Sequence, residues 1–420
     1  MAATRIAVAG GGLAGLAAAI DLKSAGCTVE LFERSRLLGG RATSFEIDGI
    51  EVDNGQHVYL QCCTEFIAFV ERLGMADALY LQDRFDVTVY AHGTASRVRA
   101  FDLPAPWHVM AAFLFYRHLS LAGKLQLLHA LRAIRQTFEG AASESFADWL
   151  REHGQGEEVV RAFWVPFMVP ALNVPLEKMN AAAAAFVIST AFLHDRNAAR
   201  FGYSRVPLAH IMERAAAQLD AVHRSKAIAS IGTQDGSVSV RTQDGEQREF
   251  DGVVLALPPR ALARVLGDAQ AFGVDSLDGF EPAAIMDAHL WHDRGRLDFD
   301  FAALLDSPVQ WIFQKADGYL CCSMSAAGDL VARPTTEIVE QVWQDVRRAL
   351  PGLASATLLR GTTTRNPEGT YSPKPGIEPP AARTTDPRVS IAGSWTATGW
   401  PDTMESAVRS GRAAAEALIR

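Results

Sequence analysis

Residues 5–35, "RIAVAGGGLAGLAAAIDLKSAGCTVELFERS", decide the fold of this chain. The apolar run Arg5 to Ala9 predicts a strand, and a glycine-rich turn follows it. An Ala- and Leu-rich helix is predicted from about Leu13 to Ser24, and a second strand from about Thr28 to Phe32. Strand, helix and strand in this order predict a βαβ unit, the building block of a parallel sheet.

The turn has the G-x-G-x-x-G spacing of dinucleotide-binding sites, in the form Gly10, Gly12 and Gly15. The first glycine permits a tight turn, the second lets the backbone approach a pyrophosphate, and the third lets the helix pack closely. The phosphates would then lie at the helix N-terminus. Glu33 follows Gly15 by 18 positions, near the interval of about 20 at which an acidic residue binds ribose hydroxyls. Its charge would repel a 2′-phosphate, which favours FAD or NAD over NADP.

Two further segments distinguish FAD from NAD. "RLLGGRATS" (residues 36–44) follows the second strand, and "VSIAGSWTATGWPDTMESAVRSGRAAAEAL" (389–418) again has the order strand, glycine turn, helix. Together they resemble the flavin amine oxidase and phytoene desaturase superfamily, where G-G-R lies by the FAD diphosphate and the C-terminal A-G turn by the ribityl chain and flavin. The superfamily usually has an acidic residue after A-G, whereas this chain has Ser394. We therefore expect the backbone N–H groups of the helix N-terminus to hold phosphate or flavin oxygens there.

The resemblance implies an α/β fold, with an FAD-binding Rossmann-like domain of the glutathione-reductase type and an inserted mixed α+β substrate domain. FAD is the implied cofactor. The residues expected to bind it are Gly10, Gly12, Leu13, Ala14, Gly15, Glu33, Arg34, Gly39, Gly40, Arg41, Gly55, Ile228, Gly393, Ser394, Thr403 and Met404.

The stretch from residue 221 to 262 predicts where the FAD-binding domain resumes. Short β-branched runs indicate a small antiparallel sheet with Asp-Gly turns at Gly236, Gly245 and Gly252. "GVVLALPP" then reads as a buried strand of the nucleotide-binding sheet. We therefore expect a discontinuous FAD-binding domain, roughly residues 1–90, 203–275 and 385–420. The substrate domain would consist of residues 91–202 and 276–384.

The composition limits the class of protein. A chain of 420 residues with 49% hydrophobic and 21% charged residues is too long for one core, so two domains are expected. The net charge of −8 makes nucleic acid an unexpected partner. Five cysteines, including the vicinal pairs Cys62–Cys63 and Cys321–Cys322, form neither a disulfide framework nor a zinc motif. With no apolar signal-peptide region and no apolar run of about 20 residues, the cytoplasm is the expected compartment.

The segment "VDNGQHVYLQCC" (52–63) is the candidate catalytic segment. Within "DNGQH" only Asp53 and His57 are good metal ligands, and the neighbouring residues offer no obvious third ligand, so no metal site is predicted. In the superfamily, the segment after G-G-R passes the flavin and enters the substrate chamber. This stretch closely resembles that of the squalene-associated FAD-dependent desaturases, the hydroxysqualene dehydroxylases of hopanoid synthesis. Similar segments recur at residues 163–188, 308–315 and 391–411.

The resemblance implies replacement of an allylic hydroxyl of a C30 isoprenoid by hydrogen, which gives squalene. The protonated hydroxyl leaves as water, and reduced FAD supplies hydride to the cation. Histidine, with an ordinary pKa of about 6.5, suits the proton transfer. Our hypothesis is that His57 donates the proton or binds the hydroxyl, Asp53 orients His57 or stabilises positive charge, and Asn54 and Gln56 order flavin and substrate. The alternative is that the segment only shapes a turn beside the flavin.

A C30 chain needs an apolar chamber. The candidates are Phe163, Trp164, Phe167, Met168, Leu172, Phe192, Trp311, Phe313 and Trp400, with Trp164, Phe167 and Trp311 first. Trp400 follows the C-terminal flavin turn, so its ring is expected near the isoalloxazine. We interpret the vicinal cysteines as small buried apolar residues; the alternative is a redox relay from Cys62 or Cys63 to the flavin.

The segment from Leu103 to Phe138 is positively charged, whereas the chain as a whole is negative. It has no Asp or Glu, while Arg117, Lys124, Arg132 and Arg135 stand beside "PAPWHVMAAFLFYRHLSL". Helices near residues 104–136 that lie on an anionic bilayer would have this composition, which predicts peripheral contact with the inner face of the cytoplasmic membrane. The alternative is a helical pair that roofs an apolar cavity.

Other functions stay open. A desaturase or an amine oxidase would take hydride from its substrate, and Lys315 is a candidate for the lysine that amine oxidases often place near flavin N5. A non-catalytic FAD-binding scaffold is a further alternative. The sequence has no second dinucleotide fingerprint, so we expect electrons from an external donor: free NAD(P)H, ferredoxin or a reductase.

Overall fold

The predicted βαβ unit is confirmed. The computed structural model describes residues 4–47, 49–136, 144–234, 236–275, 277–374 and 377–419. Strand β1 (Arg5–Ala9) leads through the glycine turn to helix α1 (Leu13–Ser24), and β2 (Thr28–Phe32) pairs with β1 in parallel. Helix α1 is apolar on nearly every side because it is enclosed between the sheet and the C-terminal helix α12 (Met404–Ile419).

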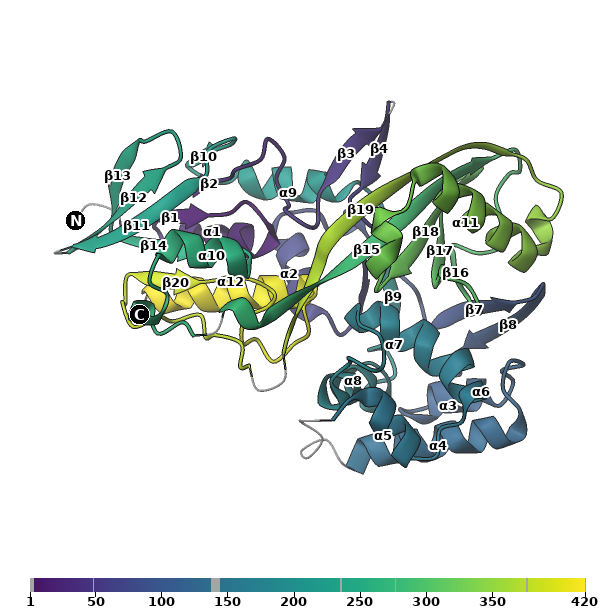
Figure 1. Ribbon diagram of the computed structural model, residues 1–420. Coiled ribbons are helices and arrows are strands. Elements are labelled where there is room, and N and C mark those ends of the chain that lie inside the picture. Colours follow the sequence, from purple (N-terminus) through teal and green to yellow (C-terminus); the bar gives the residue numbers. More distant parts are fainter. Residues whose placement is uncertain are drawn as a thin grey trace.

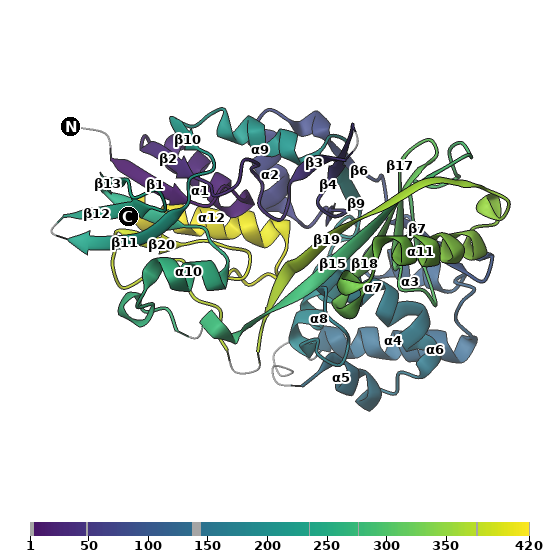
Figure 2. The same cartoon turned by 45° about the horizontal axis from the view of Figure 1, so that its top comes forward.

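Distant segments complete the parallel sheet. Its order is β10-β2-β1-β14-β20, and the three added strands are β10 (Ala221–His223), β14 (Gly252–Leu255) and β20 (Val389–Ile391). All four residues of β14 are buried, as expected for "GVVL". The segments predicted for the FAD-binding domain therefore supply all five strands. The purple N-terminal and yellow C-terminal elements lie side by side in Figures 1 and 2.

A small antiparallel sheet lies at the edge of this half, as predicted. It consists of β11 (Ile228–Gln234), β12 (Ser237–Thr242) and β13 (Gln247–Phe250). Gly236 and Gly245 occupy the two turns with φ of +85° and +88°, a conformation that glycine adopts without a steric penalty. Gly252 begins β14 instead of forming a third turn.

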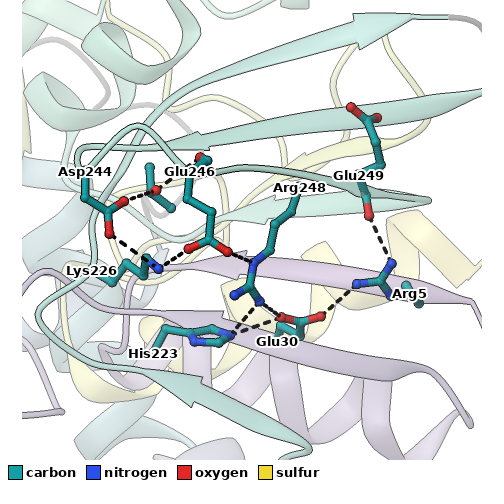
Figure 3. A network of polar contacts seen from close by, with 9 residues as sticks. Arg5, Glu30, His223, Lys226, Asp244, Glu246, Arg248 and Glu249 are labelled. Atoms are coloured by element: carbon teal, nitrogen blue, oxygen red, sulfur yellow. Dashed lines mark hydrogen bonds and ion pairs between the residues drawn. The ribbon is translucent and has the colours of Figure 1, made fainter.

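A polar network ties the small sheet to the parallel sheet (Figure 3). Glu30 on β2 accepts hydrogen bonds from Arg5 (2.9 Å) and Arg248 (2.6 Å) and contacts His223 Nε2 at 3.0 Å. These partners come from β1, β13 and β10, so one carboxylate joins three strands to its own. Because these side chains are partly exposed, their ion pairs contribute little to the stability of the fold. We infer that the network mainly fixes the position of the small sheet relative to the parallel sheet.

The second half is built on a seven-stranded mixed sheet of order β19-β15-β18-β17-β16-β7-β8. Only β16 and β7 pair in parallel among these neighbours. Although all of β7 except Ala91 lies within residues 1–90, it pairs here and not with the parallel sheet. The strands are β7 (Asp86–Ala91), β8 (Thr94–Arg99), β15 (Phe280–His292), β16 (Phe301–Leu304), β17 (Trp311–Ala316), β18 (Tyr319–Ser325) and β19 (Leu358–Pro373).

The two faces of this sheet are covered by different helices. Helix α11 (Thr335–Ala349) packs on one face against Met286, Ala288 and Leu290. These are every second residue of β15, so their side chains point to the same face of the sheet. The opposite face packs at one end on a helical layer, seen below the sheet in Figure 1. That layer contains α3 (Trp107–Phe113), α4 (Leu121–Gln136), α5 (Phe146–Glu152), α6 (Glu157–Val159), a π-helical turn (Val160–Trp164), α7 (Val165–Leu172) and α8 (Ala181–Ile188).

The remaining elements connect the halves. The hairpin β3–β4 leads into residues 54–57, and β5 leaves them, so the candidate catalytic segment lies where the halves meet. These elements are β3 (Ser44–Ile47), β4 (Ile50–Asp53), β5 (Val58–Leu60), α2 (Thr64–Arg72), β6 (Leu79–Leu81), β9 (Phe201–Ser204), α9 (Leu208–Ala216) and α10 (Pro259–Leu266). Within the described ranges, none of the helices has the length and apolar character required to cross a bilayer.

Candidate functional site

A cavity of about 1090 Å³ lies between the two halves. Pockets for one small ligand usually measure about 300–1,000 Å³, so this cavity lies just above the upper end of that range. Its lining divides into a polar part contributed by the glycine turns and an apolar part contributed by α7, α8, β5 and β17.

The first glycine turn forms the polar end. Gly10 has φ of +103°, and a Cβ there would stand 2.3 Å from the Ala256 carbonyl oxygen, so no other residue fits. Gly15 lies behind the turn, where a Cβ would come within 2.0 Å of the Gly10 oxygen. Gly12, at the N-terminus of α1, lines the cavity with Leu13 and Ala14. The helix N-terminus therefore faces the cavity, where it is available to a diphosphate.

Glu33 stands beside this turn. Its two carboxylate oxygens accept the Gly11 and Ser35 N–H groups, each at 2.7 Å, and the residue lines the cavity. A carboxylate has about four acceptor sites, so it keeps the capacity to bind ribose hydroxyls. Arg34 and Ile228 line the same region.

The G-G-R turn and the C-terminal turn are joined by Arg41. Its guanidinium makes a bidentate pair with Asp402 (2.8 and 3.0 Å) and donates to Ser394 Oγ at 2.5 Å. Ser394 therefore acts as a neutral acceptor, and Asp402 supplies the carboxylate. The G-G-R turn contributes Gly39, Gly40 and Arg41 to this wall of the cavity. The C-terminal turn and the start of α12 contribute Gly393, Ser394, Trp400, Asp402, Thr403 and Met404.

The 54–57 turn forms the wall between the polar and apolar parts. Asn54, Gln56 and His57 line the cavity, whereas Asp53 and Gly55 are not among its lining residues. Asp53 Oδ1 instead accepts from Ser44 Oγ (2.7 Å) and the Leu208 N–H (3.0 Å). Asp53 thus anchors the start of the turn.

His57 is held in one tautomer by the turn itself. Its Nδ1 lies 2.9 Å from the Gly55 carbonyl oxygen, so Nδ1–H donates and Nε2 is left as an acceptor. Burial lowers the pKa of His57, and the nearby Asp53 carboxylate offsets this only in part. At neutral pH, His57 is therefore an uncharged acceptor.

Polar side chains on β15 and β17 of the seven-stranded sheet contact the 54–57 turn, and they do not line the cavity themselves. Asp287 Oδ1 on β15 accepts the Gln56 N–H at 3.4 Å, and Lys315 on β17 donates to Gln56 Oε1 at 3.1 Å. Two residues along β15, His289 contacts the Tyr319 hydroxyl at 2.8 Å. Burial raises the pKa of Asp287 to about 6 and lowers that of His289 to about 4.

The apolar part of the cavity contains most of the expected chamber residues. Trp311 lines this part: its Nε1 donates to the Pro166 oxygen at 2.9 Å, and its ring packs edge-on against Phe167. Trp400 packs edge-on against Phe186 beside the C-terminal turn. The expected residues that line the cavity are Phe167, Met168, Phe192, Trp311, Phe313 and Trp400.

The expectation for Trp164 requires correction. Trp164 is fully buried in the helical core one turn before Phe167 and Met168, packs against Phe146, and donates its Nε1–H to Gln155 at 3.0 Å. It is absent from the cavity lining, as are Phe163 and Leu172. Cys62 and Cys63, in contrast, are only partly buried and line the cavity. In the described part of the chain, no three His, Cys, Asp or Glu side chains gather as metal ligands.

The family model for flavin-containing amine oxidoreductases matches residues 13–419. The chain belongs to this family. The match confirms the superfamily that the glycine turns indicated, and with it the FAD cofactor and the class of FAD-dependent oxidoreductases.

Curated relatives of this flavin oxidoreductase are named for dehydroxylation of hydroxysqualene and for desaturation of phytoene or zeta-carotene. A hydroxysqualene dehydroxylase from Zymomonas mobilis is 26% identical over 98% of each chain. A 15-cis-phytoene desaturase from Synechococcus elongatus is 24% identical over 99% of this chain and 96% of its own. Among solved structures, cyclohexylamine oxidase from Brevibacterium oxydans superposes with a TM-score of 0.75 at 17% identity, covering 100% of this chain and 99% of that one. This likeness confirms the α/β fold class.

The structure fits FAD at the polar end. The open terminus of α1 and Glu33 are suited to the diphosphate and ribose, and the start of α12 is suited to the flavin end. Sequence patterns missed Asp402 and Asp287 in this flavin oxidoreductase. Asp402 was visible as an acidic residue two positions before α12, and Asp287 as a charge inside the apolar strand "AAIMDAHLW".

Proposed function

We propose that this flavin oxidoreductase converts hydroxysqualene to squalene, a precursor of hopanoids and other triterpenoids. The observation that carries the proposal is the apolar chamber around Trp311, which meets the FAD site along one polar wall, the 54–57 turn. A C30 hydrocarbon with a single hydroxyl matches such a chamber, because the chain needs apolar burial and the hydroxyl needs one polar partner. The dehydroxylase relatives support the same reaction.

The turn residues would hold the reacting hydroxyl. Reduced FAD, when bound, supplies hydride to the carbon that loses oxygen. His57 Nε2 accepts a hydrogen bond from the substrate hydroxyl, since Nδ1 is engaged by Gly55. The amides of Asn54 and Gln56 orient flavin and substrate, and Asp53 keeps the turn in place through Ser44. At neutral pH the geometry thus favours binding of the hydroxyl by His57, and the proton with which the hydroxyl leaves as water is taken from solvent.

An anaerobic single turnover tests the reaction. The bound flavin is reduced with dithionite, hydroxysqualene is added, flavin reoxidation is followed in the visible band, and the extracted lipid is analysed by mass spectrometry. Reoxidation with stoichiometric squalene is expected. His57→Ala should retain FAD and slow this step, while Leu359→Ala, an exposed change on β19, should match the wild type. A flavin that stays reduced would contradict the proposal.

The second candidate is desaturation of squalene or a carotenoid precursor. The observation that favours it is His57 itself: burial lowers its pKa, and hydride removal from a hydrocarbon needs no acid at the turn. The phytoene desaturase relative supports this candidate. Bleaching of the oxidised flavin by squalene or another polyene would replace dehydroxylation with desaturation.

Two lower alternatives make different predictions. An amine oxidase would be reduced by an amine, but Lys315 contacts Gln56 and Asp53 and is absent from the cavity lining. A non-catalytic scaffold would hold flavin that no lipid oxidises or reduces. We further propose an external electron donor, and flavin reduction by NADH, NADPH or reduced ferredoxin in rapid mixing would identify its class.

We also propose that the protein contacts the inner face of the cytoplasmic membrane through α3, α4 and the loops beside them, called here the α3–α4 surface. Its cations Arg117, Lys124, Arg132 and Arg135 stand in a stretch without acidic residues, of which positions 137 and 138 lie outside the described residues. Large apolar side chains are exposed on this surface: Phe101, Leu103, Trp107, Leu114, Phe115, Leu121, Leu125 and Leu128. Exposed apolar side chains in a segment that carries cations suit an anionic bilayer.

Charge reversal tests the membrane contact. Arg117→Glu with Lys124→Glu should weaken sedimentation with vesicles that contain phosphatidylglycerol. Arg241→Glu is the matched control, because Arg241 lies on β12 at the opposite end of the molecule (Figure 1). Unchanged sedimentation of the double variant would contradict the proposal.

A further inference from the structure

The 54–57 turn is held from the substrate half of the molecule. Asp287 on β15 accepts the Gln56 N–H at 3.4 Å. Gly55 has φ of +111°, and a Cβ there would stand 3.4 Å from Asp287 Oδ2, so the backbone of the turn packs directly on this carboxyl. Lys315 adds a second tie through Gln56 Oε1 and lies 3.6 Å from Asp53. The turn is thus clamped between the two halves.

Asp287 occupies an unusual position for a carboxyl. It is 1% exposed, and its neighbours Met286 and Ala288 point to the opposite face, into the core under α11. In register, it lies opposite Ser323 on β18 and Thr364 on β19. Buried carboxyls without a direct cationic partner are costly, so they are retained where they serve a purpose.

The groups that face Asp287 come from every adjoining element. Cys321 on β18 donates its Sγ–H to Oδ1 at 3.7 Å. The Ser323 hydroxyl on β18 also hydrogen-bonds the carboxyl, and its charged and titratable neighbours are Lys315 on β17 and Tyr319, Cys321 and Cys322 on β18. His57 lies beside Gly55 in the turn, and His289 stands two residues along β15. Lys315 is engaged by Asp53 and Gln56. Burial therefore dominates, and it raises the pKa of Asp287 to about 6.

We propose that Asp287 is a positioning residue, whose carboxylate holds the Gln56 N–H and so fixes the turn that presents Gln56 and His57 to the cavity. A hydrogen bond to a carboxylate is roughly twice as strong as one to a neutral acceptor. Protonation of Asp287 therefore loosens the turn. The inference rests on the proposed function only in taking this turn as the wall between flavin and substrate.

The bound flavin reports on the turn without any turnover. The visible circular dichroism of the FAD-loaded protein is recorded from about pH 5 to 8 for the wild type, Asp287→Asn and His57→Gln. The wild type should show a transition near pH 6, Asp287→Asn should lack it, and His57→Gln should retain it. A transition that survives in Asp287→Asn, or that disappears in His57→Gln, would overturn the proposal.

Two further measurements distinguish a positioning role of Asp287 from a purely structural one. Asp287→Glu keeps a carboxyl and should retain a transition, which remains informative if Asp287→Asn loses FAD; its absence in Asp287→Glu would also overturn the proposal. In turnover, Asp287→Asn should lower kcat about 10- to 100-fold at little change in KM, as expected for misplaced groups around a bound substrate. Because the spectral test contains no substrate, its outcome is independent of whether hydroxysqualene reacts.

Discussion

The α3–α4 surface allows a quantitative prediction for membrane binding. Phe115 and Leu121 are 69% and 74% exposed. Full burial of such a side chain contributes about 2 kcal/mol, so their exposed parts leave about 1.4 kcal/mol each to be gained from a bilayer. Phe115→Ser with Leu121→Ser should therefore lose about 3 kcal/mol of membrane affinity, which is about 100-fold in the partition constant.

The assay is cosedimentation with vesicles of phosphatidylcholine and phosphatidylglycerol, with bound protein measured against lipid concentration. The matched control is Leu359→Ser, because Leu359 is 66% exposed on β19, outside the α3–α4 surface. Both proteins should keep the wild-type thermal midpoint, since the replaced side chains already face water. Equal binding of the double variant and the wild type, or an equal loss in the control, would refute the reasoning.

Three further predictions concern the FAD site and its support. Glu33→Ala leaves the Gly11 N–H without its acceptor and should weaken FAD binding at least 10-fold, measured by flavin fluorescence during titration. Gly15→Ala forces the helix away from the Gly10 oxygen, so the flavin-to-protein ratio after purification should fall well below that of the wild type. The pKa of Asp287, about 6 when folded, exceeds the ordinary value of about 3.9, so its ionisation destabilises the fold as pH rises through this interval. Asp287→Asn should thus stabilise the protein by about 2–3 kcal/mol near pH 8 and by little near pH 4; equal thermal shifts at both pH values would contradict this.

Local patterns predicted much of the fold. The βαβ unit, the small antiparallel sheet and the buried strand β14 formed where hydrophobic runs and glycine turns placed them. Each of these signals lies within a short window of sequence, and the physical preference that it reflects acts within the same window. The pairing of β7 with β16 was not visible, because it joins segments that are more than two hundred residues apart.

The candidate site could be predicted only where it is made of one segment. The glycine turn and Glu33 are of this kind. Asp402 pairs with Arg41 across 361 positions, and Asp287 meets Gln56 across 231, so no spacing rule could connect them. Trp164 was misplaced for a related reason: an aromatic residue in a helix faces core or cavity according to packing that its own segment does not specify.

The position of β20 and α12 has a consequence for the synthesis of the chain. The strand β14 pairs with β20, and α12 covers α1 so closely that a Cβ at Gly411 would come within 2.3 Å of the Ala14 oxygen. During translation, the edge of β14 and the outer side of α1 emerge long before the segment that covers them. At about 5–20 residues per second, the interval from Leu255 to Val389 lasts on the order of ten seconds, and the interval for α1 is longer. An unpaired strand edge can pair with another chain, so the edge of β14 is open to misassociation until β20 has been made.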